Sequence, residues 1–138
     1  MQNDLKLHHI GVATRNINKE FEVFSRLGYK KCSEIFEDEI QCMKGLFIEA
    51  QNQPCLELIE GVGDQNPVKS HVLKGNKFYH IAYETKNIEK DVEYFVNKQK
   101  ARVVVPITKA EYFEKICFML LPNMMLVELV QLKENKDE

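Results

Sequence analysis

The chain repeats one short segment of itself. The nine residues from His9, HIGVATRNI, resemble the nine from His80, HIAYETKNI. Aligning the chain with itself so that His9 meets His80, without gaps, gives the repeat alignment, in which eight of the sixteen positions from 9 to 24 are identical. Internal similarity of this kind indicates two copies of one supersecondary unit, which limits the possible architectures before any other feature is considered.

Each copy begins with an alternating apolar segment, LHHIGVA or FYHIAYE, which predicts a β-strand. Asn16 and Asn87 follow at positions suited to helix N-caps, and apolar residues then recur at helical spacing, with Gly28 ending the first helix. Further strands are predicted near 29–36, 41–49 and 54–60 in the first copy, and near 101–106, 114–121 and 125–132 in the second. The sequence therefore predicts an α+β protein built from two βαβββ modules.

We expect one domain over residues 1–138, with modules at about 6–61 and 78–132. The connector, 62–77, contains Pro67 and Gly75 at positions that suit the start and the end of a short helix.

The repeat alignment relates two histidines and two glutamates. It carries His9 onto His80 and Glu57 onto Glu128, so each copy has a histidine on its first strand and a glutamate on its last. A lone strand histidine is usually structural, and a lone glutamate between leucines usually faces solvent. Their shared spacing favours convergence of all four on one point, if the copies are related by approximate two-fold symmetry.

Two imidazoles and two carboxylates suit a divalent ion such as Zn, Ni, Co, Mn or Fe. On an octahedral ion this set leaves two positions for water or a substrate with two oxygens. A metal beside a carbonyl oxygen stabilises an enolate, so that a carboxylate can remove a proton from the neighbouring carbon. Two other histidines are not included, because His8 pairs with Tyr79 in the repeat and should face the other way, and His71 has no counterpart.

Composition narrows the partners. The chain has 19 basic and 21 acidic residues, which gives no basic face for nucleic acid. We expect neither a signal peptide nor a membrane span. Four cysteines without C-x-x-C spacing favour a reducing cytoplasm.

The segments HHIGVATRNI, LELIEGVGDQNPV, YHIAYETKNI and LVELVQ occur in the order typical of the vicinal oxygen chelate superfamily, also called the glyoxalase/bleomycin-resistance/dioxygenase fold, and the chain resembles that superfamily over nearly its whole length. The resemblance implies a cupped, eight-stranded sheet around a metal held by His9, Glu57, His80 and Glu128. It also implies a small-molecule substrate and a homodimer, in which the metal site lies either within one chain or between two subunits.

Two branches resemble the chain most: the glyoxalase I (lactoylglutathione lyase) group and methylmalonyl-CoA epimerase. Both imply a metal-dependent lyase or isomerase acting through a metal-stabilised enolate, with Glu128 as the catalytic base and Glu57 as the symmetric alternative. Epimerases typically have a Glu-Gln-Gly segment on the third strand, where this chain has Ile40 and Gln41 in the first two places. A glyoxalase I-like activity is therefore the leading prediction, and an epimerase is the alternative.

Two further classes remain. A non-catalytic binding protein of the bleomycin-resistance kind would commonly lack the metal residues. An oxygenase would use Fe(II) held by two histidines and one carboxylate, and the fourth ligand counts against it.

Overall fold

The computed structural model describes residues 5–134 and divides the chain into two compact units. The first unit is His9–Tyr79, and the second comprises residues 5–8 and 80–134. Nine strands and three α-helices make the described part a predominantly β structure, and each unit is built on a mixed sheet. The predicted α+β fold class is confirmed; the single domain and the module bounds stay predictions.

The first unit orders its strands β2-β4-β5-β1, with β3 also paired to β4. Only β1 and β5 are parallel. The elements are β1 (Lys6–Thr14), α1 (Ile17–Ser25), β2 (Lys30–Lys31), β3 (Phe36–Asp38), β4 (Met43–Glu49), β5 (Leu56–Gly61) and α2 (Lys69–Lys74). Helix α1 packs beside β5 over a core of aliphatic side chains that includes Ile17, Leu46 and Leu58.

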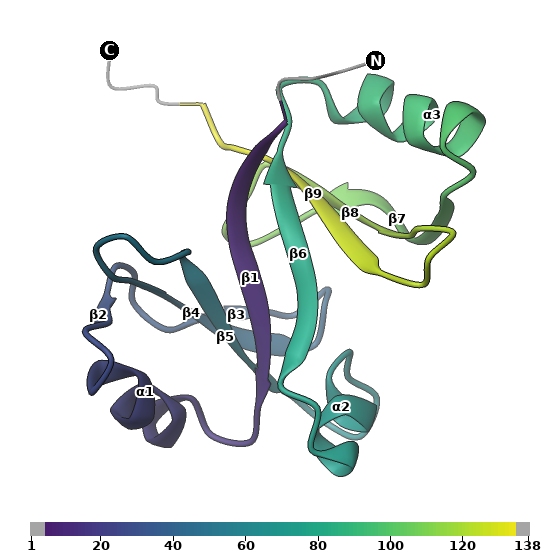
Figure 1. Cartoon of the computed structure of the whole chain (residues 1–138). Helices are drawn as coiled ribbons and strands as arrows, with labels where there is room; N and C mark the ends of the chain where they lie inside the picture. Colours follow the sequence, from purple (N-terminus) through teal and green to yellow (C-terminus); the bar gives the residue numbers. More distant parts are fainter. Residues whose placement is uncertain (1–4, 135–138) are drawn as a thin grey trace. The chain divides into compact units, whose positions relative to one another are not determined.

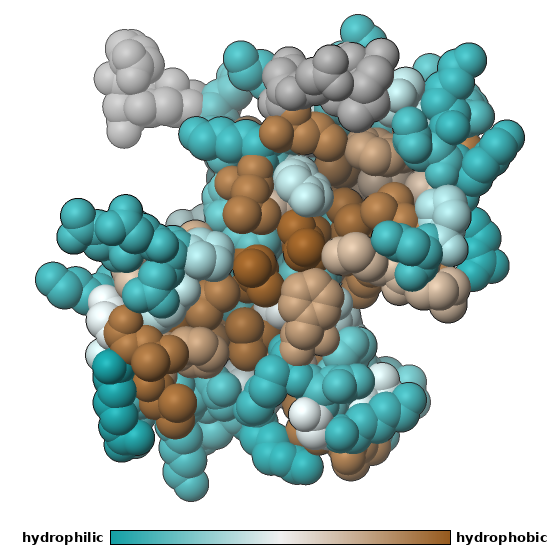
Figure 2. Space-filling model, viewed as in Figure 1, coloured by the Kyte–Doolittle hydropathy of each residue, from teal (hydrophilic) through white to brown (hydrophobic). Residues whose placement is uncertain are grey.

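The second unit repeats this order as β6-β9-β8-β7, with β6 and β9 parallel. Its elements are β6 (Phe78–Glu84), α3 (Ile88–Lys98), β7 (Arg102–Lys109), β8 (Lys115–Leu120) and β9 (Leu126–Gln131). Helix α3 packs on β7, β8 and β9 (Figure 1). Its outer side in this view is hydrophilic (Figure 2), while Ile88 is completely buried below it. Such an amphipathic helix explains the apolar spacing in the sequence.

The two long helices begin with the same hydrogen bonds. In α1, Asn16 Oδ1 accepts from Lys19 N at 2.9 Å and Ile17 N donates to Glu60 Oε1 at 3.0 Å. The side-chain bonds confirm both predicted N-caps, Asn16 and Asn87. The bond from Ile17 also links the start of α1 to β5, the last strand of the first module.

In α3, Asn87 Oδ1 accepts from Lys90 N at 3.1 Å and Ile88 N donates to Gln131 Oε1 at 3.0 Å. Glu60 and Gln131 are themselves counterparts in the repeat alignment. The repeat thus extends to the side chains that fix each helix against its sheet.

The second strand of the first module differs from the prediction. One strand was expected over 29–36, but the structure has two short ones, β2 and β3, with an irregular segment between them. Within that segment Ser33 Oγ accepts from Phe47 N at 3.0 Å. A side-chain oxygen thus replaces the backbone carbonyl that a continuous ladder would supply, which accounts for nine strands instead of eight.

The connector helix starts later than expected. We expected it to open at Pro67, but α2 begins at Lys69, because Asn66 Oδ1 accepts from Val68 N at 3.1 Å and forms a turn there. Gly75 ends it as predicted, with a left-handed φ of 73°.

We expect Asn87→Ala to lower the free energy of unfolding by about 1 kcal/mol, because Lys90 N loses its side-chain acceptor. Urea denaturation measures the change. The equivalent Asn16→Ala should lose a similar amount, whereas Lys86→Ala, an exposed position beside the cap, should change stability little. Equal stability of Asn87→Ala and the unchanged protein would contradict the capping role.

Candidate metal centre

In the first unit, His9 and Glu57 form a buried pair. His9 lies on β1 and Glu57 on the neighbouring parallel strand β5, where Gly11 is the direct partner of Glu57 in the register. His9 Nε2 lies 3.0 Å from Glu57 Oε1, and the two residues are 0% and 5% exposed. Because Gly11 has no side chain, β1 places no bulky group directly beside the Glu57 carboxylate.

The second unit contains an equivalent pair. His80 lies on β6 and Glu128 on the parallel strand β9, where Ala82 is the direct partner of Glu128. His80 Nε2 lies 3.0 Å from Glu128 Oε1, and the residues are 1% and 4% exposed. Parallel pairing of the first and last strand in each unit therefore produces the same imidazole–carboxylate contact twice.

An aromatic ring stands against each histidine. The rings of His9 and Phe47 meet edge to face at a centroid distance of 5.0 Å, as do those of His80 and Phe118. Phe47 is the antiparallel partner of Glu57, and Phe118 is that of Glu128. These phenylalanines were not among the predicted site residues, although they too are counterparts in the repeat alignment. They restrict the orientation of both imidazole rings from the strand beyond each glutamate.

Gly45 shapes the first pair. A Cβ placed at residue 45 would lie 2.4 Å from the Phe36 ring and 3.0 Å from Glu57 Oε2. The Phe36 ring stacks on Phe47, with an interplanar angle of 15°. Only glycine at this position therefore lets the stacked rings and the Glu57 carboxylate keep their places. The repeat alignment places Ile116 at the corresponding point of the second unit, so the two pairs have different surroundings.

Nearby cysteines stay protonated. Burial, followed by the Glu128 carboxylate, raises the pKa of Cys117 to about 11. Burial and the neighbouring Cys32 raise the pKa of Cys55 to about 12, with smaller effects from Glu49 and Glu57. Both groups are therefore thiols at neutral pH in the metal-free protein.

His9, Glu57, His80 and Glu128 form a buried group of side chains that could hold a metal ion. Their donors match the mixed nitrogen and oxygen set that first-row divalent ions accept. Burial of carboxylates is costly unless a positive charge or hydrogen-bond donors compensate it, so a dication suits this group.

A family model described as the glyoxalase/bleomycin resistance protein/dioxygenase superfamily matches residues 8–118. The chain belongs to this superfamily. The match begins one residue before His9 and includes Glu57 and His80, while Glu128 lies beyond its end.

Solved structures agree on the glyoxalase-like fold. A methylmalonyl-CoA epimerase from Mycobacterium tuberculosis matches with a TM-score of 0.82 and 15% identity, covering 97% of this chain and 93% of the epimerase. A Streptomyces coelicolor methylmalonyl-CoA epimerase variant in complex with 2-nitronate-propionyl-CoA matches with a TM-score of 0.79 and 20% identity, covering 98% and 100%. A hypothetical protein from Bacillus halodurans C-125 matches with a TM-score of 0.78 and 23% identity, covering 99% and 100%.

No curated protein sequence matches the chain significantly. Within residues 5–134, no helix combines the length and apolar character that crossing a membrane requires.

The segment where epimerases have Glu-Gln-Gly is a turn here. We expected a strand over 41–49, but β4 begins at Met43. Gln41 donates from Nε2 to Asp38 Oδ2 at 2.8 Å, and its backbone N donates to Asp38 Oδ1 at 3.0 Å. Ile40, at the position of the epimerase glutamate, is 66% exposed. The Gln41 side chain therefore closes the β3–β4 turn on Asp38.

The other two histidines contact different groups. The ring of His8 lies edge to face with Phe113, at 5.1 Å between centroids. The ring of His71 lies in the same way against Tyr79, also at 5.1 Å. Among the described residues, the buried group that could hold a metal contains neither of them.

We expect Gly45→Ala to weaken binding of a divalent ion by about tenfold or more, because the new methyl group displaces the Phe36 ring or Glu57 Oε2. Titration with Ni²⁺ or Zn²⁺ measures this effect. Gly28→Ala is the matched control, because Gly28 has a φ of 98° and open space around it. That substitution should destabilise the fold and leave metal affinity unchanged. Similar metal affinities in the two variants would show that Gly45 has no role at the pair.

Proposed function

We propose that His9, Glu57, His80 and Glu128 hold one divalent ion, two ligands from each unit. The proposal is supported mainly by the repetition of one buried pair: the same residue types, the same 3.0 Å contact and an equivalent phenylalanine in both units. Duplication accounts for the likeness of the two pairs, and a shared ion would account for the gathering of all four side chains in one buried group. Bound there, the ion would act as a Lewis acid toward a substrate carbonyl and so increase the acidity of the neighbouring carbon.

The reaction that this arrangement supports best is proton transfer at a carbon beside a carbonyl, of the glyoxalase I-like lyase or isomerase type. Glu128 is the proposed base, and its Oε1 accepts the proton and returns it to the same or the neighbouring carbon. Glu57 is the symmetric alternative, and its surroundings differ, because Gly45 lies beside its Oε2 where the repeat alignment places Ile116 in the second unit. Glu128 comes first because the equivalent glutamate can act on the substrate in both branches that the chain resembles. Phe47 and Phe118 help to exclude water from the two pairs, since both are almost completely buried.

Methylmalonyl-CoA epimerisation is the second candidate. It is favoured by the structural likeness to epimerases, two of which are described in complex with 2-nitronate-propionyl-CoA or with methylmalonyl-CoA. An epimerase needs a proton acceptor on each face of the substrate. Ile40 supplies none, and Gln41 is bonded to Asp38. This departure is the reason for placing a one-base lyase or isomerase first.

A binding protein without catalysis is the third candidate. It is less favoured because such proteins commonly lack the metal residues, whereas this chain has a buried group of His and Glu residues that could hold an ion. The homodimer and the cytoplasmic location stay predictions from the family resemblance and from the cysteine content.

We expect the purified chain to bind one divalent ion, and His80→Ala to lower the affinity at least about 100-fold, because half of the nitrogen donors are lost. Metal analysis and competition with a chelator measure both quantities. His8→Ala is the matched control and should retain full affinity, since His8 packs on Phe113. Two ions per chain, or unchanged affinity in His80→Ala, would refute a single four-ligand site.

Deuterium exchange at the substrate carbon tests the reaction. Metal-loaded protein in D₂O should incorporate deuterium into the product from the glutathione hemithioacetal of methylglyoxal, detected by mass spectrometry. Glu128→Gln should lower the rate by at least about 100-fold while the variant still binds metal, because an amide cannot accept the proton. Glu57→Gln is the comparison for the choice of base.

The same assay with methylmalonyl-CoA separates the two leading candidates. Exchange with that thioester alone would favour the epimerase. Exchange with neither substrate, in protein that has bound its metal, would count against both activities and favour the binding role.

A further inference from the structure

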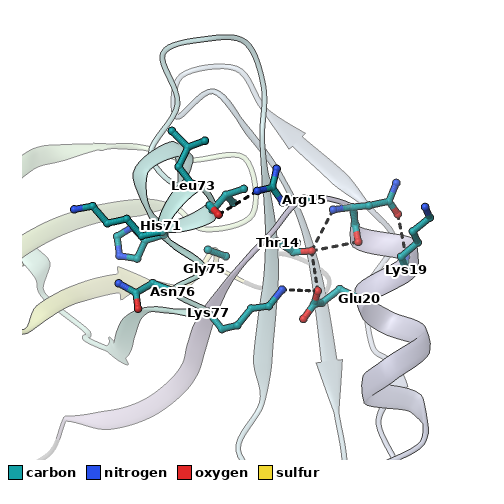
Figure 3. A pocket seen from close by; sticks show the side chains of 13 residues that line it. Thr14, Arg15, Lys19, Glu20, His71, Leu73, Gly75, Asn76 and Lys77 are labelled. Carbon is teal, nitrogen blue, oxygen red and sulfur yellow. Dashed lines mark hydrogen bonds and ion pairs between the residues drawn. The ribbon is translucent and has the colours of Figure 1, made fainter.

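A hollow lies beside the β1–α1 turn of the first unit, against the connector helix α2 (Figure 3). Its walls come from two segments, 13–20 and 71–77, both within His9–Tyr79. Its volume is about 530 Å³, within the range of sites that bind small metabolites.

The charge of this hollow is strongly unbalanced. Its lining carries four basic side chains and one carboxylate, although the whole chain has a net charge of −2. These residues are Arg15, Lys19, Lys74, Lys77 and Glu20. Cations gathered around a concave surface repel one another and attract an anion, because the field of each extends over the same volume.

The one carboxylate in the lining, Glu20, already accepts two hydrogen bonds from neighbouring side chains. Glu20 Oε1 accepts from Lys77 Nζ at 2.8 Å and from Thr14 Oγ1 at 3.1 Å (Figure 3). Arg15 Nη2 reaches across to the carbonyl oxygen of Val72 at 3.4 Å, which holds the guanidinium at the α2 side of the hollow. Within residues 5–134, Arg15, Lys19 and Lys74 have no carboxylate at ion-pair distance.

The second unit provides an internal comparison. The β6–α3 turn also borders a hollow, and the repeat alignment carries Arg15 and Lys19 onto Lys86 and Lys90. There, three basic residues are matched by three carboxylates: Lys6, Lys86 and Lys90 against Glu84, Asp91 and Glu134. In both units the turn contains a threonine and an asparagine that cap the following helix, so capping explains these two residues. Of the two hollows, only the one in the first unit has a surplus of basic residues, to which α2 contributes Lys74.

We propose that the hollow at β1–α1 and α2 binds a phosphate group of a soluble metabolite, attracted by the surplus positive charge that Arg15, Lys19 and Lys74 give its lining. A phosphate ester or diphosphate offers several acceptor oxygens and a charge that offsets the surplus of cations. The phosphate belongs either to the tail of the substrate or to a separate metabolite. The metal proposal is not a premise of this inference, because none of the four metal-ligand candidates lines the hollow.

Calorimetric titration with pyrophosphate tests the site. The protein is first stripped of metal, because pyrophosphate chelates divalent ions. We expect binding that weakens with added salt and that falls by about tenfold or more in Lys19→Glu. Lys90→Glu, the equivalent change in the balanced hollow, should bind like the unchanged protein. If Lys19→Glu folds poorly, Lys74→Glu is the second test variant and should also lower the affinity for pyrophosphate.

Two thioesters distinguish the sources of phosphate. If the phosphate is part of the substrate, pyrophosphate should compete with propionyl-CoA for binding. Lys19→Glu should then lower the affinity for propionyl-CoA and leave the affinity for propionyl-pantetheine, which lacks the phosphates of CoA, unchanged. If it belongs to a separate metabolite, pyrophosphate and propionyl-CoA should bind independently. Absence of pyrophosphate binding, or equal weakening in Lys19→Glu and Lys90→Glu, would overturn the proposal. Loss of metal binding in His80→Ala is measured separately, so each proposal can fail alone.

Discussion

The contact between a buried imidazole and a buried carboxylate, made once in each unit, is the constraint on which the rest of the structure depends. Desolvation of a carboxylate costs several kcal/mol unless a close partner compensates it. The parallel pairing of β1 with β5, and of β6 with β9, brings that partner to 3.0 Å in both units. A slip of either strand by one residue would turn that strand's member of the pair to the opposite face and break the contact, so the pairs demand one register.

The helix caps enforce the same register from the other end of the strands. Glu60 on β5 accepts from the first backbone N–H of α1, and Gln131 on β9 does the same for α3. Each last strand therefore carries a metal-ligand candidate and, three residues later, a capping side chain. A strand that slipped would lose both contacts together, so one pairing satisfies local helix formation and the buried polar groups at once.

Sequence reasoning found the parts of the fold that are encoded by local pattern or by the repeat. Asn16 and Asn87 could be identified as caps because their side chains act on residues three positions away. His9 and Glu57 could be paired because His80 and Glu128 recur at the same spacing. The break between β2 and β3 could not be predicted, because it depends on a hydrogen bond from Phe47 to Ser33, fourteen residues away. Gln41 was placed in a strand for a different reason: its partner Asp38 is only three residues away, so the turn was a local signal that the apolar pattern of the following strand obscured.

The duplicated units have also diverged, and the divergence bears on function more than the likeness does. At the pairs, Gly45 and the stacked rings of Phe36 and Phe47 surround Glu57, whereas Ile116 occupies the equivalent place near Glu128. Under the proposed function a base must leave the ion to accept a proton, and unequal surroundings would let one of the two carboxylates remain a ligand while the other reacts. At the helix starts, the same turn is electrically balanced in one unit and cationic in the other. In both places the repeat supplies a shared frame, and differences between the copies give equivalent groups different surroundings.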